Sequence, residues 1–144
     1  MLQDYQKEEE LLCICECGAV TSSQRSSFES LPKVLILHLK RFRFTEDFQV
    51  QKIHHPVVLC RDLVISSNQG AGCYSLVSVI SHHGSGAESG HYISDGLDQN
   101  VGESDPSDRW FTYDDARVTE TTGASACEQR IQSSYILFYK RHLD

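Results

Sequence analysis

The sequence predicts an α+β domain made mainly of antiparallel strands, with little helix. Three observations lead to this prediction. Residues 31–44, LPKVLILHLKRFRF, contain a nearly continuous apolar run, which is typical of a strand covered on both faces. Residues 74–80, YSLVSVI, alternate apolar and small polar side chains, as a half-buried strand does. Glycine-punctuated turns separate such segments, and helical patterns are short and weak.

The N-terminal segments are polar. Residues 1–12 have a weak helical pattern, with a charged face at Lys7 and the three glutamates that follow it. Residues 21–30 are rich in serine, and Phe28 suggests that they are extended. The strand at 31–44 then opens near Pro32, because proline is tolerated at the first residue of a strand.

The middle of the chain alternates short apolar segments with turns. Residues 66–72, SSNQGAG, are predicted to be a loop, and residues 82–90, HHGSGAESG, a turn. The apolar segments between them predict strands at 56–59, 63–65, 74–80 and 91–95. The last two are expected to form a hairpin with a long tip.

The C-terminal third is predicted to complete the sheet. Residues 95–108 form a polar insertion that we expect to be exposed. Residues 109–115, RWFTYDD, return to strand character, and a short helix with a Thr or Ser cap is expected within 119–131. Residues 133–141, SSYILFYKR, predict a closing strand that is too apolar to be an edge open to water.

Composition narrows the class of protein. A length of 144 residues suits one domain or part of a larger one. The net charge of -7 disfavours non-specific binding to nucleic acid and is compatible with a basic partner. No apolar run approaches the roughly 18 residues of a membrane helix. The acidic N-terminus lacks the layout of a secretory signal, so the six cysteines are interpreted as reduced, in the cytoplasm or the nucleus.

The candidate catalytic residue is His91, in the stretch ESGHYISDG. Histidine titrates near neutral pH, so it can accept and return a proton during turnover. Such a base works best when a carboxylate fixes its tautomer, and Asp114 and Asp115 are the candidates. Gly90 leaves room for a substrate backbone to approach. From spacing alone, the favoured interpretation remains a histidine at a strand start and two aspartates in a turn.

An ordered set of motifs favours the catalytic interpretation. The set resembles the C-terminal half of the ubiquitin-specific proteases, a family of cysteine deubiquitinases, over roughly residues 11–141. It is highly specific because five motifs occur in the right order: LPKVLILHLKRF, PVVL, YSLVSVISHHGSGAESGHYISD, RWFTYDDARV and SSYILFYKR. The resemblance implies a papain-like cysteine protease fold, of which this chain would be part of the palm and fingers.

The resemblance also implies roles for individual residues. His91 matches the general base, Asp114 the carboxylate that orients it, and Asp115 a position that keeps the site polar. The positions expected to bind substrate are His82, Gly84, Gly90 and Tyr92. His82 and the tip 84–89 would gate the entry of ubiquitin's extended tail. Trp110 is expected in the core. The implied partners are ubiquitin and ubiquitinated proteins, with no nucleic acid and no membrane.

The chain departs from the family pattern at the nucleophile. The family places its catalytic cysteine in a box rich in Gly, Asn and Cys, well ahead of the LPKVL strand, and the preceding thirty residues contain nothing similar. Neither Cys60 nor Cys73 has a helix N-terminal context that would lower a thiol pKa. We therefore expect residues 1–144 to be a partial catalytic domain that supplies base and acid without the nucleophile.

Residues 13–18, CICECG, are interpreted as the remnant of a zinc-ribbon knuckle. The family often carries a four-cysteine zinc site, and Cys17 stands near its last ligand, but Ile14 occupies the expected partner position. Structural zinc needs four ligands, so no metal and no cofactor are predicted. His54 and His55 are adjacent in extended chain and are interpreted as surface residues.

Three functions stay open. The chain could be the C-terminal part of an active deubiquitinase, which cleaves the bond at the C-terminal glycine of ubiquitin. It could be a truncated relative that binds ubiquitin's tail or another partner without cutting. It could also be an orphan fragment without stable function, whose apolar strands would leave exposed surface.

Overall fold

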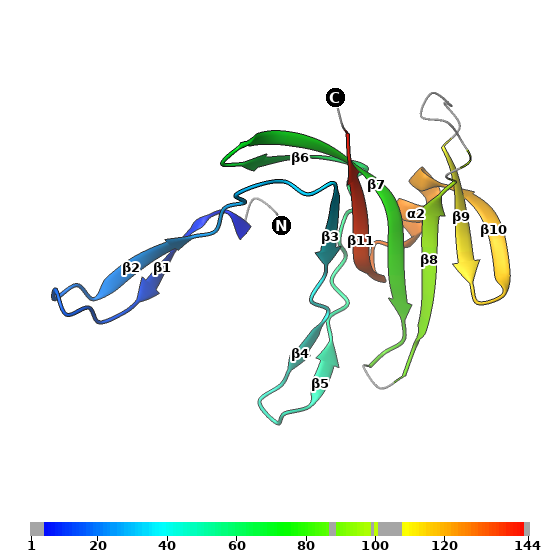
Figure 1. Cartoon of the computed structure of the whole chain (residues 1–144). Helices are drawn as coiled ribbons and strands as arrows, with labels where there is room; N and C mark the ends of the chain where they lie inside the picture. The colour runs from blue at the N-terminus through cyan, green and yellow to red at the C-terminus, as the bar shows by residue number, and fades with distance from the viewer. Residues whose placement is uncertain (1–4, 87–88, 99, 101–107, 143–144) are drawn as a thin grey trace. The chain divides into compact units, whose positions relative to one another are not determined.

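A computed structural model describes residues 5–86, 89–98, 100 and 108–142 (Figure 1). The chain divides into two compact units. One consists of residues 1–31 and 66–71, and the other of residues 32–65 and 72–144. Antiparallel pairing dominates the described residues, which confirms the predicted fold class. Within this part of the chain, no helix has the length and apolar character needed to cross a membrane.

The smaller unit is organised by the antiparallel hairpin of β1 (Glu8–Leu12) and β2 (Thr21–Arg25). The predicted helix over 1–12 is therefore wrong for residues 8–12. A short charged segment forms an isolated helix poorly in water, whereas pairing with residues 21–25 satisfies its backbone groups. The same unit contains the tip of a second hairpin, where the Asn68 amide donates to the Phe28 carbonyl at 2.9 Å.

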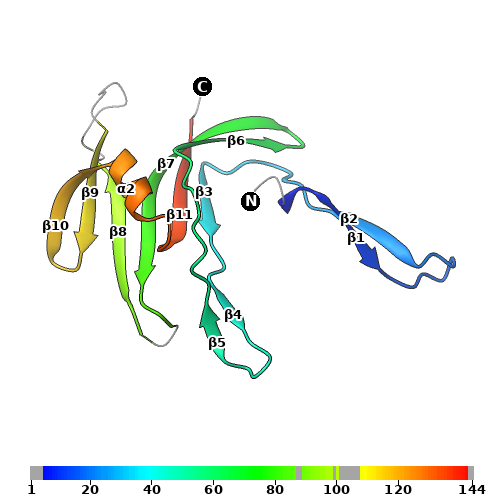
Figure 2. The same cartoon turned by 180° about the vertical axis from the view of Figure 1, so that it is seen from behind.

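The larger unit is built on an antiparallel sheet in the order β10-β9-β8-β7-β11-β3, with β6 paired to β7 (Figures 1 and 2). Its strands are β3 (Val34–His38), β6 (Asp62–Ser67), β7 (Gly70–His83), β8 (His91–Leu97), β9 (Arg109–Asp114), β10 (Arg117–Thr122) and β11 (Ser134–Arg141). The closing strand β11 lies between β7 and β3, which confirms that it is not an edge.

The predicted strand at 31–44 is interrupted. β3 ends at His38, and β4 (Phe42–Phe44) begins a separate hairpin with β5 (Val50–Lys52). The cause is Arg41, which is 3% exposed and turns its guanidinium onto backbone carbonyls. The acceptors are the carbonyls of Ile53, His55, Ile131 and Ser134, at 2.5–3.2 Å. Burial lowers the pKa of Arg41, and the four acceptors compensate its donors.

β3 is also an edge strand of the described sheet, with Val34 and Ile36 half exposed. The expectation that both its faces are covered is therefore wrong for this structure. The predicted strand at 56–59 is wrong as well, because these residues run between elements without pairing in a ladder. The Val57 amide bonds to the Ile131 carbonyl at 2.8 Å instead. The predicted loop at 66–72 shrinks to a turn at 68–69, because β7 begins at Gly70, whose φ of 127° suits glycine.

The core of the larger unit lies along β7 and β11. Tyr74, Leu76 and Val79 are buried on β7, and Leu137 and Tyr139 are buried on β11. The buried residues of β7 are two apart at Tyr74 and Leu76, but Val79 follows after three. This change lies where the pairing register with β11 shifts, opposite Phe138 and Tyr139. A bulge of this kind re-aims the side chains that follow it. Trp110, also expected in the core, is fully buried.

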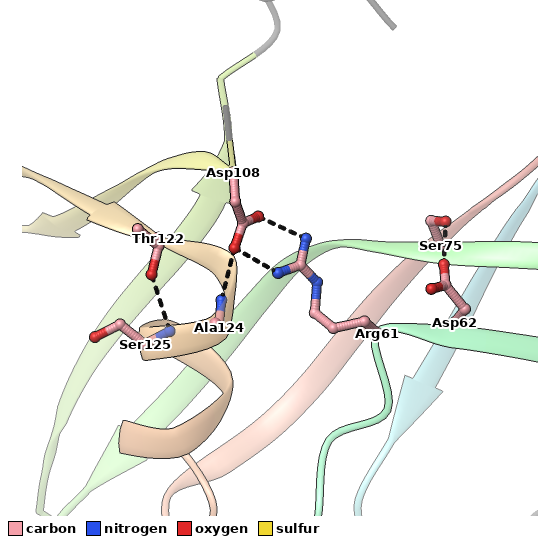
Figure 3. Close-up of polar contacts among 7 residues, drawn as sticks. All are labelled: Arg61, Asp62, Ser75, Asp108, Thr122, Ala124 and Ser125. Carbon is pink, nitrogen blue, oxygen red and sulfur yellow. Dashed lines mark hydrogen bonds and ion pairs between the residues drawn. The ribbon is translucent and has the colours of Figure 1, made fainter. Parts of the chain in front are cut away.

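The predicted short helix is α2 (Gly123–Gln129), which packs against β8, β9 and β10. Its cap is Thr122, whose hydroxyl accepts the Ser125 amide at 3.1 Å (Figure 3). Asp108 holds the same end in place, since its carboxylate accepts the Ala124 amide at 2.9 Å and two Arg61 nitrogens at 2.9 and 2.7 Å (Figure 3). The Arg61 guanidinium lowers the pKa of Asp108.

The segment 95–108 is only partly as predicted. Asp95 is fully buried in β8 and Asp98 is 7% exposed, so the expected exposure is wrong for these two residues. Asp95 accepts Arg130 Nε at 2.7 Å, Arg130 Nη2 at 3.2 Å and the Thr112 hydroxyl at 2.6 Å. The burial of Asp95 is possible because these donors satisfy its charge. Residues 99 and 101–107 lie outside the described residues.

Candidate functional site

The site lies where β8 begins and β9 ends. Because these strands are antiparallel, the first residue of β8 and the last residue of β9 meet at the same end of the sheet. His91 and Asp114 occupy these two positions, and His91 Nε2 is hydrogen-bonded to Asp114 Oδ1. Both side chains remain accessible, with 45% and 41% of their surface exposed. The structure therefore brings together the pair that the sequence predicted.

The electrostatics of the pair favour a charged imidazole. The hydrogen bond that His91 Nε2 donates to the Asp114 carboxylate raises the pKa of His91, with further contributions from the charges of Asp114 and Asp115. Asp115 follows the end of β9 with a φ of 51°. Since Asp114 occupies Nε2, the arrangement leaves Nδ1 as the ring nitrogen available for a reacting group.

The Asp114→Asn variant should lower the pKa of His91 towards the ordinary value of about 6.5, because the neutral amide no longer stabilises the imidazolium. The raised pKa stabilises the native protein below the unfolded-state pKa, and this contribution disappears as pH rises through the folded-state value. NMR titration of the His91 ring measures the pKa, and urea unfolding at several pH values measures the contribution to stability. Asp115→Asn is the matched control and should shift the pKa less. Equal shifts for the two variants would contradict the assignment of Asp114.

His82 does not lie in the gating loop where the sequence placed it. It belongs to β7 and is 3% exposed, because β7 continues to pair with β8 through His82↔Tyr92 and His83↔His91. Burial lowers the pKa of His82, and the charges of Lys52 and His83 lower it further. The lowered pKa favours the neutral form of this buried ring.

An aromatic cluster surrounds His82. Its ring centroid lies 4.8 Å from that of Tyr92, 5.7 Å from Phe42 and 6.4 Å from Tyr135. Tyr92 is 54% exposed, so this cluster reaches solvent next to His91. Of the predicted substrate-binding residues, Tyr92 is the one with an exposed aromatic ring. The buried His82 ring packs against it.

Lys52 is a residue of this region that the sequence reasoning missed. It is 7% exposed, and its Nζ donates to the carbonyls of His82 and Gly84 at 2.8 and 2.7 Å. These bonds tie the β4–β5 hairpin to the end of β7. No local pattern reveals this role, because its acceptors lie about thirty residues away in the sequence.

Both predicted glycines have structural reasons to be glycine. Gly84 has a φ of 146°, which side chains rarely adopt. At Gly90, a Cβ atom would lie 2.1 Å from His82 Nε2 and 2.7 Å from the His83 carbonyl oxygen. Gly90 thus permits the close approach of the turn to the buried histidine.

Gly90→Ala is therefore expected to lower the free energy of unfolding by about 1–3 kcal/mol, since the added methyl group must displace the His82 ring and the β7 backbone. Gly86→Ala in the same turn is the control, because nothing lies within 4 Å of the position of its Cβ. Urea unfolding of the two variants measures the difference. A Gly90→Ala protein as stable as Gly86→Ala would show that the packing at His82 is not as described.

The same end of the sheet has three side chains of types that can bind a metal ion. One ligand atom from each of His91, Asp114 and Asp115 lies within 4.8 Å of the others. Because His91 and Asp114 are hydrogen-bonded directly to each other, proton transfer accounts for the arrangement more simply than metal binding does. Within the described residues, no cysteine sulfur is in hydrogen-bond contact with His91. Cys60 and Cys73 are exposed, and burial raises the pKa of Cys127.

Comparison with known proteins gives a consistent result. A family model described as ubiquitin carboxyl-terminal hydrolase matches residues 4–139. Ubiquitin hydrolase B of Dictyostelium discoideum is 35% identical over 124 residues, covering 84% of this chain and 25% of that protein. Human ubiquitin carboxyl-terminal hydrolase 3 is 33% identical over 129 residues, covering 84% and 23%. The chain thus spans about a quarter of the length of these curated relatives.

Solved structures share the fold. A chain in the yeast SAGA DUB module with an Sgf73 mutant superposes with a TM-score of 0.82 at 24% identity, covering 99% of this chain and 32% of that one. A chain of the SAGA Ubp8/Sgf11/Sus1/Sgf73 DUB module bound to ubiquitin aldehyde gives a TM-score of 0.76 at 21% identity, covering 99% and 32%. At these identities the likeness establishes the fold alone.

Proposed function

Because this chain belongs to the ubiquitin carboxyl-terminal hydrolase family, we propose that it supplies the general base and the orienting acid of a thiol-dependent ubiquitin hydrolase. The observation that carries the proposal is the hydrogen bond between His91 and Asp114 at the end of β8 and β9. In this proposal, residues 1–144 are part of a catalytic domain whose nucleophilic cysteine comes from a segment outside this sequence.

The proposed reaction is acyl transfer to that cysteine. His91 accepts the thiol proton at Nδ1 while Asp114 holds Nε2, and the raised pKa of His91 favours the thiolate–imidazolium pair. The thiolate attacks the carbonyl carbon of ubiquitin's last glycine. His91 then protonates the leaving amine as the C–N bond breaks. Water attacks the thioester in the second half, again with His91 as base, and ubiquitin is released with a free carboxylate.

The proposed substrate contacts lie beside His91. Tyr92 offers an exposed ring supported by His82, and Gly90 offers a backbone without a side chain next to the base. An extended peptide ending in glycines has little bulk, so it fits a surface where Gly84 and Gly90 keep side chains out of the way. Asp115 keeps this end of the sheet polar and negative, which favours a tail with basic residues.

A second function is a ubiquitin-tail-binding module without catalysis. It is favoured by one observation: within the described residues, the base has no cysteine sulfur beside it. The exposed Tyr92 ring would contact the ubiquitin tail in the same way under both functions. The third possibility is an orphan fragment. Val34 and Ile36 are half exposed on the edge strand β3, and such a fragment would be expected to aggregate through this apolar surface.

Two measurements separate these functions. We expect no covalent adduct when this chain alone is treated with ubiquitin carrying a C-terminal electrophile. An adduct would refute the claim that the nucleophile comes from elsewhere. We expect saturable binding of ubiquitin, weakened by Tyr92→Ala and by removal of the last residues of ubiquitin. Aggregation without binding would favour the orphan fragment.

A further inference from the structure

The smaller unit places three cysteines at the turn that closes the β1–β2 hairpin. Cys13 and Cys15 pair with the other side of the hairpin, since their amides donate to the carbonyls of Val20 and Ala19 at 3.1 and 2.9 Å. The Gly18 amide returns to the Cys15 carbonyl at 2.9 Å, and Gly18 has a φ of 86°. Cys15 to Gly18 is therefore a β-turn.

This turn brings two sulfur atoms together. Cys15 Sγ and Cys17 Sγ lie 2.8 Å apart, and both side chains are exposed. This separation is little more than the disulfide bond length of about 2.05 Å, so small side-chain movements bring the sulfurs to bonding distance. The described residues contain no second sulfur–sulfur contact of this kind, although Cys60 and Cys73 are also exposed.

We propose that Cys15 and Cys17 form an oxidisable dithiol, which a hydroperoxide converts to a disulfide across the single residue Glu16. One of the two sulfurs attacks the peroxide oxygen, so that an S–O bond forms, the O–O bond breaks and an alcohol or water leaves. The other sulfur then attacks the sulfur of this sulfenic acid. The S–S bond forms, the S–O bond breaks and water leaves, with two thiols oxidised and one peroxide reduced.

The local geometry supports formation of this disulfide. The two sulfur atoms are already in contact and open to solvent, so a peroxide can reach either of them. The three backbone hydrogen bonds of the turn involve no sulfur, so they can persist in both redox states. A disulfide closed over so short a turn is exposed and strained, which makes it reducible by cellular thiols.

Peptide mass spectrometry after peroxide treatment tests the proposal on the chain as it is. Trypsin releases residues 8–25 with all three cysteines, and the Cys15–Cys17 disulfide lowers the mass of this peptide by about 2 Da and suppresses fragmentation between its two cysteines. We expect this disulfide to form at least about ten times faster than Cys60 or Cys73 is oxidised, and to reverse with dithiothreitol.

Single variants provide the controls. Cys15→Ser and Cys17→Ser should abolish the fast disulfide, whereas Cys13→Ser should leave it unchanged. A fast disulfide that involves Cys13 in the parent protein would overturn the proposal. So would oxidation of Cys15 and Cys17 at the rate of Cys73. Zinc retained at one ion per chain and lost in all three serine variants would overturn it as well, because the thiols would then be metal ligands.

Discussion

Replacing His91 with alanine should lower kcat/KM for ubiquitin hydrolysis by about 10²–10⁴-fold in a protein that unites this chain with the nucleophile, since this is the usual contribution of a positioned base. A suitable protein is a chimaera in which the chain replaces the matching segment of human ubiquitin carboxyl-terminal hydrolase 3, its relative at 33% identity. Release of a fluorophore attached to the C-terminus of ubiquitin measures the rate.

The exposed His54 provides the matched control for this substitution, since it lies in the unpaired segment before Pro56. His54→Ala should keep the rate of the parent chimaera. His91→Ala should fold normally, because the His91 side chain is 45% exposed. A fully active His91→Ala chimaera would exclude His91 as the base.

Replacing Asp95 with alanine should lower the free energy of unfolding by about 3–5 kcal/mol. Asp95 is fully buried and Arg130 is 8% exposed, so the substitution leaves a buried guanidinium without its carboxylate. Part of the loss comes from the Thr112 hydroxyl, which also loses its acceptor. Urea unfolding followed by circular dichroism gives the change.

The ion pair between Arg61 and Asp108 is the control for Asp95. Their side chains are 38% and 34% exposed, so water screens the pair, and Asp108→Ala should cost only about 1–2 kcal/mol, including the loss of the Ala124 hydrogen bond. The combined replacement Asp95→Leu with Arg130→Met should recover most of the stability lost in Asp95→Ala, because no buried charge is left alone. Equal losses for Asp95→Ala and Asp108→Ala would show that Asp95 is not buried as described.

The sequence predicts elements whose signals are local. The apolar run at 133–141 predicted an interior strand, and β11 lies between β7 and β3. A threonine before a short helical segment predicted the cap that Thr122 provides. The pairing of His91 with Asp114 was implied by the order of the motifs and not by spacing alone. The antiparallel pairing of β8 with β9 explains why these two positions meet.

Features that depend on distant partners were not predicted. Asp95 looked exposed because it stands among polar residues, and its partner Arg130 comes 35 positions later. The interruption of the 31–44 strand comes from Arg41, whose acceptors include a carbonyl 93 residues away. His82 looked like part of a glycine-rich turn, whereas two further ladder pairs extend β7 to His83. Local pattern does not reveal such long-range pairing.

Chemical rescue tests the role of the His91 imidazole most directly. In the chimaera with His91→Gly, added imidazole should restore hydrolysis in proportion to the concentration of its unprotonated form, and Asp114→Asn in the same protein should weaken that rescue. If His91→Gly binds ubiquitin as the parent does but imidazole restores no activity at any pH, the imidazole of residue 91 is not the proton carrier.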